Sequence, residues 1–442
     1  MANWALELDD RTLATAVDGV LQTGTARVSA GARRDGSAAR HWHEFAGARR
    51  PAPQVLAAVA ADLDACLASA DGALRVATPS RFEPAALGQL LGLLRSRSRT
   101  VAAFVDAAAV TVAALGSQRG ALVVDAGLQH VAVARVDILG TDQGPVAQRR
   151  RVLVGERGGL STLIDLWLDL VSDAMVRRTR FDPLHDAATE RSLLEALPGL
   201  ARTAGRDGET VVSVESAGQR YQVTLSRDQF ATPAQPLYRE LAGLLHELRP
   251  AGAQLNIVVP QSLIELPGFS ESLEIFAGCE LWVIPDGFAA CAASSLPQED
   301  FAAAGVRLLR RLPLRPQPQL AALAQSWLLG LGGARDASPT HVLFGGKALP
   351  LAGEPVEIGR DRGVRGLQLP DGLAGVSRFH CSLRRDADAV FLIDYSRFGT
   401  LVNGERVAGR ARLRAGDTVR IGDPGVELNL ISVDSERAAP KI

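Results

Sequence analysis

Apolar residues recur with two spacings along the first three quarters of the chain. Helical spacing, with apolar positions three and four apart, predicts helices at 53–68, 84–95, 160–177, 189–197 and 233–248. Short runs rich in Val, Ile and Leu predict strands at 4–9, 74–79, 100–106, 121–127, 130–137, 211–216, 221–226, 255–260 and 281–285. Strands that alternate with helices are typical of an α/β domain.

The pattern changes after residue 340. From there, short strand-like runs are separated by Gly, Asp and Asn, and strands at such close spacing predict a compact all-β sandwich. The stretch before it is rich in Pro and Gly, which favours a flexible connector with one short helix. The predicted organisation is an α/β domain over 1–311, a linker over 312–340, a sandwich over 341–435 and a tail over 436–442.

Composition excludes several classes of function. The 442 residues carry 48 basic and 49 acidic side chains, and this balance gives no electrostatic basis for a nucleic-acid partner. The four cysteines form no CxxC pair, so neither a disulfide framework nor a metal site is indicated. The most apolar stretch, 101–115, is shorter than the roughly 20 residues of a membrane span. We therefore expect a cytoplasmic protein without direct membrane insertion, and the excess of Arg, Ala and Gly indicates a GC-rich bacterial source.

Four short motifs follow one another in the sandwich region. They are Gly359-Arg360, the stretch 377–380 (SRFH), the stretch 394–400 (DYSRFGT) and Val402-Asn403-Gly404. Their order and spacing resemble a forkhead-associated (FHA) domain, a β-sandwich that binds phosphothreonine peptides. Guanidinium forks and hydroxyl donors on loops suit a phosphate dianion, so the residue types agree with that resemblance.

The resemblance implies a role for each residue of these motifs. Arg360 and Ser377 would hold the phosphate, Arg378 would assist, and Arg397 would supply another loop donor. Phe398 stands where the family has an Asn that hydrogen-bonds the peptide backbone, and an aromatic ring packs beside a peptide without replacing those hydrogen bonds. Asn403 completes the expected peptide-binding set. The remaining motif residues are expected to be structural: Gly359, His380, Gly399 and Thr400.

The order of elements over 1–311 resembles the superfamily of actin, the heat-shock chaperone ATPases and the sugar kinases. The stretches that carry it are 74–116, 121–137, 155–171 and 209–245, and the chaperone branch is the closer match. The resemblance implies a two-lobed actin-like ATPase fold, in which two Gly-rich hairpins, each with an Asp, hold the nucleotide phosphates and their metal ion.

The hairpin residues depart from that pattern. Asp9-Asp10-Arg11 lacks the Gly that a phosphate-cradling turn needs, and the second hairpin keeps only Asp125 and Gly127. Pro260 fixes the backbone in the loop that contacts adenosine in the superfamily, where backbone freedom is needed. The chaperone branch also uses a lysine in the cleft, and residues 1–346 contain none. We therefore predict a degenerate, non-catalytic relative without a cofactor. Asp9, Asp125 and Gly127 are the residues of a residual nucleotide or metal site. Binding of Mg-ATP at this site is the alternative that we disfavour.

Two further clusters are interpreted as surface. The segment 41–44 (HWHE) has two imidazoles and a carboxylate but no third metal ligand at a recognisable spacing, so it is expected to be a solvated loop. The run Arg149-Arg150-Arg151 is expected to be solvated as well.

The leading hypothesis is a non-catalytic signalling adaptor. A chaperone-like pseudo-ATPase body would dock protein partners, and the FHA domain would recruit a threonine-phosphorylated protein. Two alternatives stay open: a slow ATP-hydrolysing conformational switch, and a structural component, able to oligomerise, whose FHA domain does not read phosphate.

Overall fold

The computed structural model divides the chain into two compact units, Met1–Leu329 and Gly330–Ile442. Asn403 and the expected tail 436–442 lie outside the described residues. The structure describes residues 3–9, 11–22, 26–27, 41–48, 50–216, 218–250, 255–276, 278–297, 305–329, 338–344, 347–361, 366–370, 373–386, 389–402, 405–415, 417–422 and 425–431.

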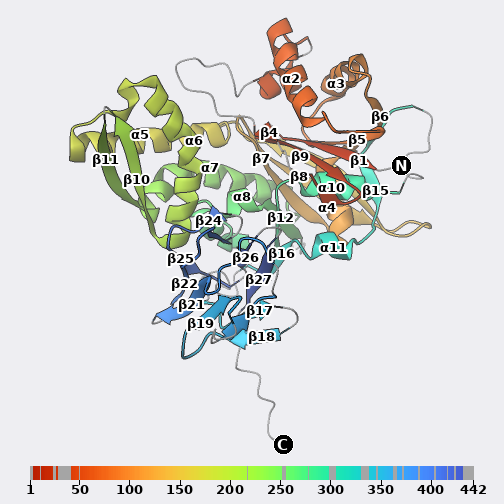
Figure 1. Cartoon of the computed structure of the whole chain (residues 1–442). Coiled ribbons are helices and arrows are strands. Elements are labelled where there is room, and N and C mark those ends of the chain that lie inside the picture. Colours follow the sequence, from red (N-terminus) through yellow and green to blue (C-terminus); the bar gives the residue numbers. More distant parts are fainter. Residues whose placement is uncertain are drawn as a thin grey trace, which may run out of the picture. The chain divides into compact units, whose positions relative to one another are not determined.

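The first sheet of Met1–Leu329 has the strand order β14-β6-β5-β1-β2-β3, with β4 also paired to β2. Figure 1 labels its strands β1, β4, β5 and β6. Strand β1 is antiparallel to β2 and parallel to β5. Most residues of β5 and β6 are buried, as is usual for parallel strands covered on both faces. The strands are β1 (Trp4–Leu8), β2 (Thr12–Val17), β3 (Val20–Leu21), β4 (Ala26–Arg27), β5 (Ala73–Thr78), β6 (Thr100–Asp106) and β14 (Leu308–Leu309).

The second sheet has the order β15-β9-β8-β7-β12-β13-β16. Strand β7 is antiparallel to β8 and parallel to β12. The strands are β7 (Ala121–Ala126), β8 (Val131–Leu139), β9 (Val146–Val154), β12 (Asn256–Pro260), β13 (Glu280–Ile284), β15 (Arg311–Pro313) and β16 (Gln325–Leu328).

The two sheets repeat one arrangement. In the first, β3, β2 and β1 run antiparallel, and β5 and β6 continue parallel to β1. In the second, β9, β8 and β7 run antiparallel, and β12 and β13 continue parallel to β7. Residues 1–329 are therefore built from two α/β halves of the same strand order, and the turns β1–β2 and β7–β8 occupy equivalent positions in the two halves.

Helices cover the outer faces and fill the space between the sheets. Helices α1–α3 share a core with the first sheet, and α5–α7 share a core with the second. The helices are α1 (His41–Gly47), α2 (Pro53–Cys66), α3 (Pro84–Ser96), α4 (Ala107–Leu115), α5 (Leu160–Thr179), α6 (Ala187–Asp207), α7 (Arg227–Leu248), α8 (Gln261–Ile264), α9 (Phe269–Ser272), α10 (Phe288–Ser294) and α11 (Pro318–Ala321). Two 3-10 turns, η1 (Pro183–His185) and η2 (Glu274–Phe276), and a hairpin of β10 (Glu209–Ser216) and β11 (Gln219–Ser226) complete this unit.

Helices α4 and α10 form the centre of this unit. Helix α4 contacts β8 and β9, α10 contacts β1 and β2, and the two helices contact each other. Every residue of α4 from Ala108 to Leu115 is buried, as expected for a helix that is apolar all round. The Asp106 side chain caps α4 by accepting a hydrogen bond from the Ala109 amide, and Gly116 ends it in the left-handed conformation at φ 72°.

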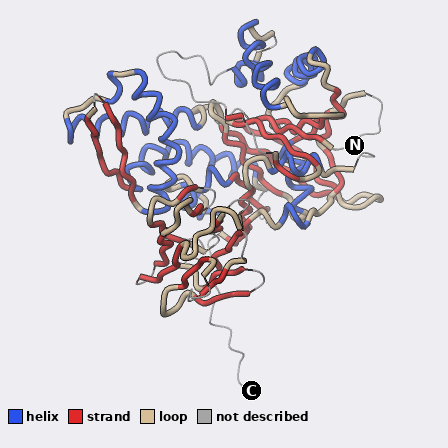
Figure 2. The backbone as a smooth tube through the Cα atoms, in the orientation of Figure 1, coloured by secondary structure: helices blue, strands red, loops and turns tan. Residues whose placement is uncertain are grey.

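The second unit is a sandwich of two sheets, in the orders β18-β17-β27-β26-β23-β24 and β20-β19-β21-β22-β25. Its apolar core is drawn from both sheets, and its described residues form no helix (Figure 2). The strands are β17 (His341–Phe344), β18 (Lys347–Pro350), β19 (Val356–Gly359), β20 (Gly366–Gln368), β21 (Cys381–Asp386), β22 (Ala389–Asp394), β23 (Thr400–Val402), β24 (Glu405–Arg406), β25 (Arg410–Leu413), β26 (Thr418–Ile421) and β27 (Val426–Ile431).

Part of the expected linker 312–340 belongs to the first unit instead. Strand β15 pairs with β9, and β16 pairs with β13 where a helix was expected. The apolar residues Leu312, Leu320 and Leu329 are all buried, so this segment gains burial by completing the sheet edges. Pro313 is tolerated there because a proline fits an edge strand.

Three local predictions are corrected by the structure. Segment 41–44 is the start of α1 rather than a solvated loop, because His41 and Trp42 are buried and both bond the Asp62 carboxylate, at 2.7 and 2.8 Å. Helix α6 continues past Pro198. Helix α7 begins at Arg227 rather than 233, because Ser226 and Gln229 form a capping box.

Within the part of the chain that the structure describes, no helix combines the length and the apolarity needed to cross a bilayer.

Candidate functional site

Ser377 connects three loops at one end of the sandwich. Its carbonyl oxygen accepts a hydrogen bond from the Arg360 amide at 3.2 Å, and its hydroxyl oxygen accepts one from the Arg397 amide at 3.4 Å. Its own amide donates to Nδ1 of His380 at 3.0 Å. Three of the predicted phosphate-site residues, Arg360, Ser377 and Arg397, are thus brought together through their backbone groups and the Ser377 hydroxyl oxygen.

His380 supports the Ser377 loop from the interior of the sandwich. The side chain is fully buried, and burial lowers its pKa. Because Nδ1 accepts the Ser377 amide, the neutral ring carries its proton on the other nitrogen. The geometry places His380 as a brace between Ser377 and the core rather than as a ligand on the surface.

Gly359 permits the close approach of two loops. The Asp361 amide donates to the Arg378 carbonyl at 3.0 Å, and a Cβ on Gly359 would overlap that same carbonyl. Only glycine therefore lets the Arg360 loop lie against the segment that carries Ser377 and Arg378.

Asp394 organises the third loop. Its carboxylate accepts hydrogen bonds from the Ser396 amide at 3.0 Å and from the Thr400 hydroxyl at 2.9 Å. The amide of Gly399, whose φ is +91°, donates to the Ser396 hydroxyl at 2.7 Å. Asp394 belongs to the motif 394–400, but no role was predicted for it. Its place at the start of a turn is the signal for one, because Asp bonds the backbone two residues on.

The Arg360 side chain has an unsatisfied donor. Its Nε is buried, and none of the described residues accepts a hydrogen bond from it. A buried donor without an acceptor costs about 1–3 kcal/mol. Arg378 adds an exposed guanidinium on the neighbouring loop.

Aromatic side chains border the same loops. The rings of Phe379 and Tyr395 stack with centroids 4.9 Å apart. The Phe398 side chain is 64% exposed, and the Arg397 guanidinium lies 5.8 Å from its ring centroid.

These loops lie inside a recognised domain. Residues 356–422 match the FHA domain family, so this part of the chain is an FHA domain, which suggests phosphothreonine-dependent protein binding. The match begins after the end of the first unit, which receives no family assignment. A search of the curated proteins finds no match to the chain.

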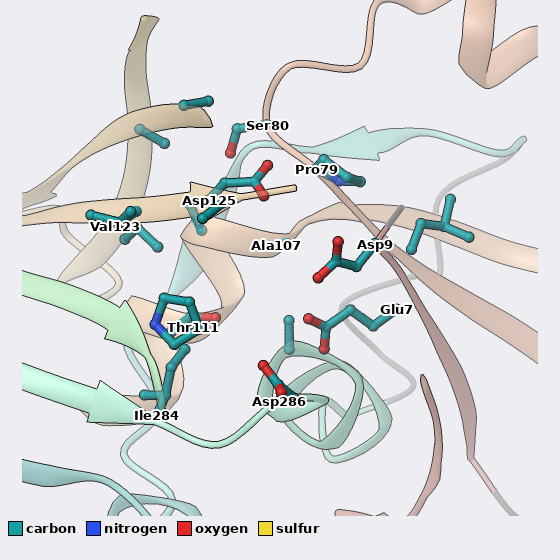
Figure 3. Close-up of a pocket in the computed structure, with 18 of the residues that line it drawn as sticks. Glu7, Asp9, Pro79, Ser80, Ala107, Thr111, Val123, Asp125, Ile284 and Asp286 are labelled. Atoms are coloured by element: carbon teal, nitrogen blue, oxygen red, sulfur yellow. The ribbon is translucent and has the colours of Figure 1, made fainter. Parts of the chain in front are cut away.

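A second candidate lies in the first unit, where a cavity of about 90 Å³ opens between the two halves. Glu7 and Asp9 come from β1 and the turn after it, and Asp286 precedes α10. Figure 3 shows these three carboxyl groups directed into a common space, with Asp125 of β7 on its other side. The predicted pair Asp9 and Asp125 therefore lines one cavity.

Arg11 occupies the β1–β2 side of this cavity and binds the chain itself. Its Nε and Nη2 donate to one Asp9 carboxylate oxygen at 2.9 and 2.6 Å. Its Nη1 donates to the Ser262 hydroxyl at 2.7 Å, and Nη2 lies 3.5 Å from the Asp286 carboxylate. Arg11 thus joins the first half to residues more than 250 positions further along the chain.

Burial and neighbouring charges shift the pKa values of two residues at the cavity, Glu7 and Arg11. Burial, reinforced by the charges of Asp9 and Asp286, raises the pKa of Glu7 to about 7, although the Ala290 amide donates to its carboxylate at 2.9 Å. Burial lowers the pKa of Arg11, but the carboxylates of Asp9 and Asp286 outweigh it and raise that pKa above its ordinary value. Arg11 is a permanent cation here.

Asp125 and Gly127 belong to the second hairpin. The Asp125 carboxylate lies 3.5 Å from Nε2 of His130. The Gly127 amide donates to the His130 carbonyl, and the Gly127 carbonyl accepts from the Leu160 amide at the start of α5. Both backbone groups of Gly127 therefore serve the hairpin and its junction with α5. The described residues hold no cluster of three or more His, Cys, Asp or Glu placed to bind a metal ion.

Arg149, expected to be solvated, contributes to this region instead. It lies on β9 and its Nε is 3.1 Å from the carboxylate of Asp106, which is buried. The Ser80 hydroxyl donates to the same carboxylate at 2.9 Å. Arg149 therefore neutralises the residue that caps α4.

Proposed function

We propose that the chain is a non-catalytic adaptor whose FHA domain recruits a threonine-phosphorylated protein. The observation that carries the proposal is the buried Nε of Arg360, for which the described residues offer no acceptor, on a loop whose Arg360 amide bonds the Ser377 carbonyl. A guanidinium donor that is already desolvated gains a charge-assisted hydrogen bond to a phosphate dianion without a further desolvation cost. Arg378 and Arg397 supply further positive charge for the same ligand.

The test measures binding of the full chain to a fluorescent phosphothreonine peptide by anisotropy. We expect binding that disappears with the unphosphorylated peptide and falls at least tenfold in Arg360→Ala and in Ser377→Ala, since each removes a charge-assisted hydrogen bond. Arg384→Ala is the matched control, because Arg384 is an exposed arginine on β21. Equal affinity for both peptides, or equal losses in all three variants, would contradict the proposal.

For the first unit, we propose a degenerate member of the actin and heat-shock chaperone superfamily that serves as a docking body. The repeated strand order of its two halves supports this assignment. The hairpin between β1 and β2, where that superfamily holds phosphates, carries Arg11 bonded to Asp9 instead of a glycine.

The residues of the cavity do not fit Mg-ATP. Its volume of about 90 Å³ is well below the roughly 300–1,000 Å³ of sites for drug-sized ligands. Arg11 already bonds the Asp9 carboxylate, so that group would have to give up this ion pair before it could hold a metal-bound water.

A thermal-shift titration of the full chain with Mg-ATP and Mg-ADP tests this part separately. We expect no change in melting temperature at millimolar nucleotide, because a ligand raises stability only where it binds the folded state. A saturable rise would favour the ATP-driven switch instead.

A further inference from the structure

A β-bulge interrupts strand β9 at its run of three arginines. Arg149 is paired with Val136 of β8 and Arg151 is paired with Arg135, so Arg150 is an extra residue in the ladder. Consecutive side chains of a regular strand point to opposite faces of the sheet, and a bulge re-aims them. The bulge therefore lets Arg150 and Arg151 serve one face of the sheet while Arg149 serves the other.

Four arginines share the face that Arg150 and Arg151 serve. Arg135 lies directly opposite Arg151 on this face. The Asp137 carboxylate accepts hydrogen bonds from Arg135 at 2.8 and 3.1 Å, and the Arg150 Nε lies 3.5 Å from it. Arg311 of β15 lies in the same cross-strand row as Asp137. We call these four residues the arginine surface: Arg135, Arg150, Arg151 and Arg311.

The arginine surface carries more positive than negative charge. The side chains of Arg150 and Arg151 are 51% and 58% exposed, and Arg311 is exposed as well. The carboxylates that pair with the surface are those of Asp137 and of Glu247 at the end of α7. None of the described residues forms an ion pair with Arg311. Two carboxylates of the chain thus face four guanidiniums.

Local electrostatics do not favour this arrangement. Like charges directly opposite each other on neighbouring strands are destabilising, and Arg135 faces Arg151 in this way. Asp137 compensates one of these charges, whereas the exposed pair of Arg151 with Glu247 contributes little. Positive charge therefore collects where the fold alone gains nothing from it, and departures of this kind from local rules occur at functional sites.

We propose that the arginine surface binds an acidic segment of a partner protein. Guanidinium forks bind carboxylates through paired hydrogen bonds, and a surface with an excess of one charge attracts a segment of the opposite charge. The inference rests on the docking role proposed for the first unit, and it names the surface and the chemistry of that docking. It does not depend on phosphothreonine.

A nucleic acid fits this surface less well than an acidic protein segment. Phosphate backbones are bound by surfaces that neutralise many phosphates at once. Here Asp137 and Glu247 lie among the arginines, and the chain as a whole is close to neutral, with 48 basic and 49 acidic side chains.

The test measures binding of the full chain to a fluorescent peptide in which Glu alternates with Ser. The alternation places all carboxylates on one side of an extended segment. We expect the peptide to bind at about 0.05 M salt and to be released at about 0.5 M salt, because salt screens charges at a protein surface. The same peptide with Gln in place of Glu should not bind.

Two double variants locate the site. Arg150→Gln with Arg151→Gln should weaken binding of the Glu peptide about tenfold, since it removes half of the arginine surface. Both side chains are more than half exposed, so this variant is expected to fold. Arg177→Gln with Arg178→Gln is the matched control, because these are also consecutive exposed arginines, on α5, and their loss changes the net charge equally. Arg360→Ala should leave the affinity for the Glu peptide unchanged.

The outcomes separate the inference from the function of the FHA domain. Failure of the Glu peptide to bind, or equal losses in the two double variants, would refute the inference and leave phosphothreonine recognition, measured with its own peptide, standing. Failure of phosphothreonine peptides to bind, with the Glu peptide still held by Arg150 and Arg151, would refute phosphothreonine recognition and support the inference. Tighter binding of an oligothymidine strand or of phosphatidylserine vesicles than of the Glu peptide, lost in the Arg150 and Arg151 variant, would overturn the assignment to a protein segment.

Discussion

Replacing Arg11 with alanine tests whether its contacts across the cavity stabilise the first unit. The substitution removes both hydrogen bonds to Asp9, the bond to Ser262 and the attraction to Asp286. It leaves Asp9 with a charge that water reaches poorly, because the side chain is only 15% exposed. The first unit should therefore lose stability.

The magnitude follows from the burial of the pair. Removing one partner of a buried ion pair costs about 3–5 kcal/mol, whereas an exposed pair contributes about 0–1 kcal/mol. Arg11 and Asp9 are 16% and 15% exposed, so we take the lower end of the buried range, about 3 kcal/mol. For a unit of this size, each kcal/mol lowers the melting temperature by about 2 °C. The expected loss is about 6 °C.

Scanning calorimetry of the full chain measures this loss. Arg151→Ala is the matched control, because Arg151 pairs with Glu247 at 2.7 Å while the two side chains are 58% and 56% exposed; its melting temperature should fall by less than about 2 °C. The double variant Asp9→Ala with Arg11→Ala should lose less than the sum of the single variants. Wild-type stability in Arg11→Ala, or strict additivity in the double variant, would refute the reasoning.

Two further predictions follow from the same structure. Because the pKa of Glu7 is raised to about 7 from an ordinary value of 4.5, the folded state binds more protons than the unfolded state between these pH values, and stability falls as the pH rises through that window; Glu7→Gln should flatten this fall in urea-unfolding experiments from pH 4.5 to 8, and an unchanged slope would contradict the assignment. Gly359→Ala should abolish phosphopeptide binding and lower the melting temperature, because the new Cβ overlaps the Arg378 carbonyl, whereas Gly140→Ala, where a Cβ meets open space, should leave binding unchanged.

The sequence predicted most strands because their apolar runs are local signals. It missed β9, where Arg149, Arg150 and Arg151 interrupt the apolar pattern, and it read a run of three arginines as solvated. The ion pair of Arg149 with Asp106 depends on a partner 43 residues away, which no local pattern reveals. The strand β16 was missed for a similar reason: its half-exposed residues carry no strand pattern of their own, and its pairing with β13 is not a local signal.

The candidate sites were predictable to different degrees. The sandwich motifs placed Arg360, Ser377 and Arg397 on loops that the structure brings together, because short motifs in a fixed order imply a fixed scaffold. The unsatisfied Nε of Arg360 could not be foreseen, since it depends on which acceptors the fold leaves out of reach. Likewise, the sequence indicated that Arg11 crowds its turn, but only the structure supplies Ser262 and Asp286 as its partners.

Arg11 of the first unit and Arg360 of the sandwich differ in how their side-chain donors are satisfied, and this contrast bears on where an anion binds. Among the described residues that line the first cavity, four carboxyl groups, those of Glu7, Asp9, Asp125 and Asp286, face the one guanidinium of Arg11. That balance repels phosphate and satisfies the cation internally. In the sandwich, the Arg360 Nε is desolvated with no acceptor, and a desolvated donor gains most from an anion. Phosphate recognition by this chain is therefore expected at the FHA loops, and the cavity of the first unit instead joins its two halves through Arg11.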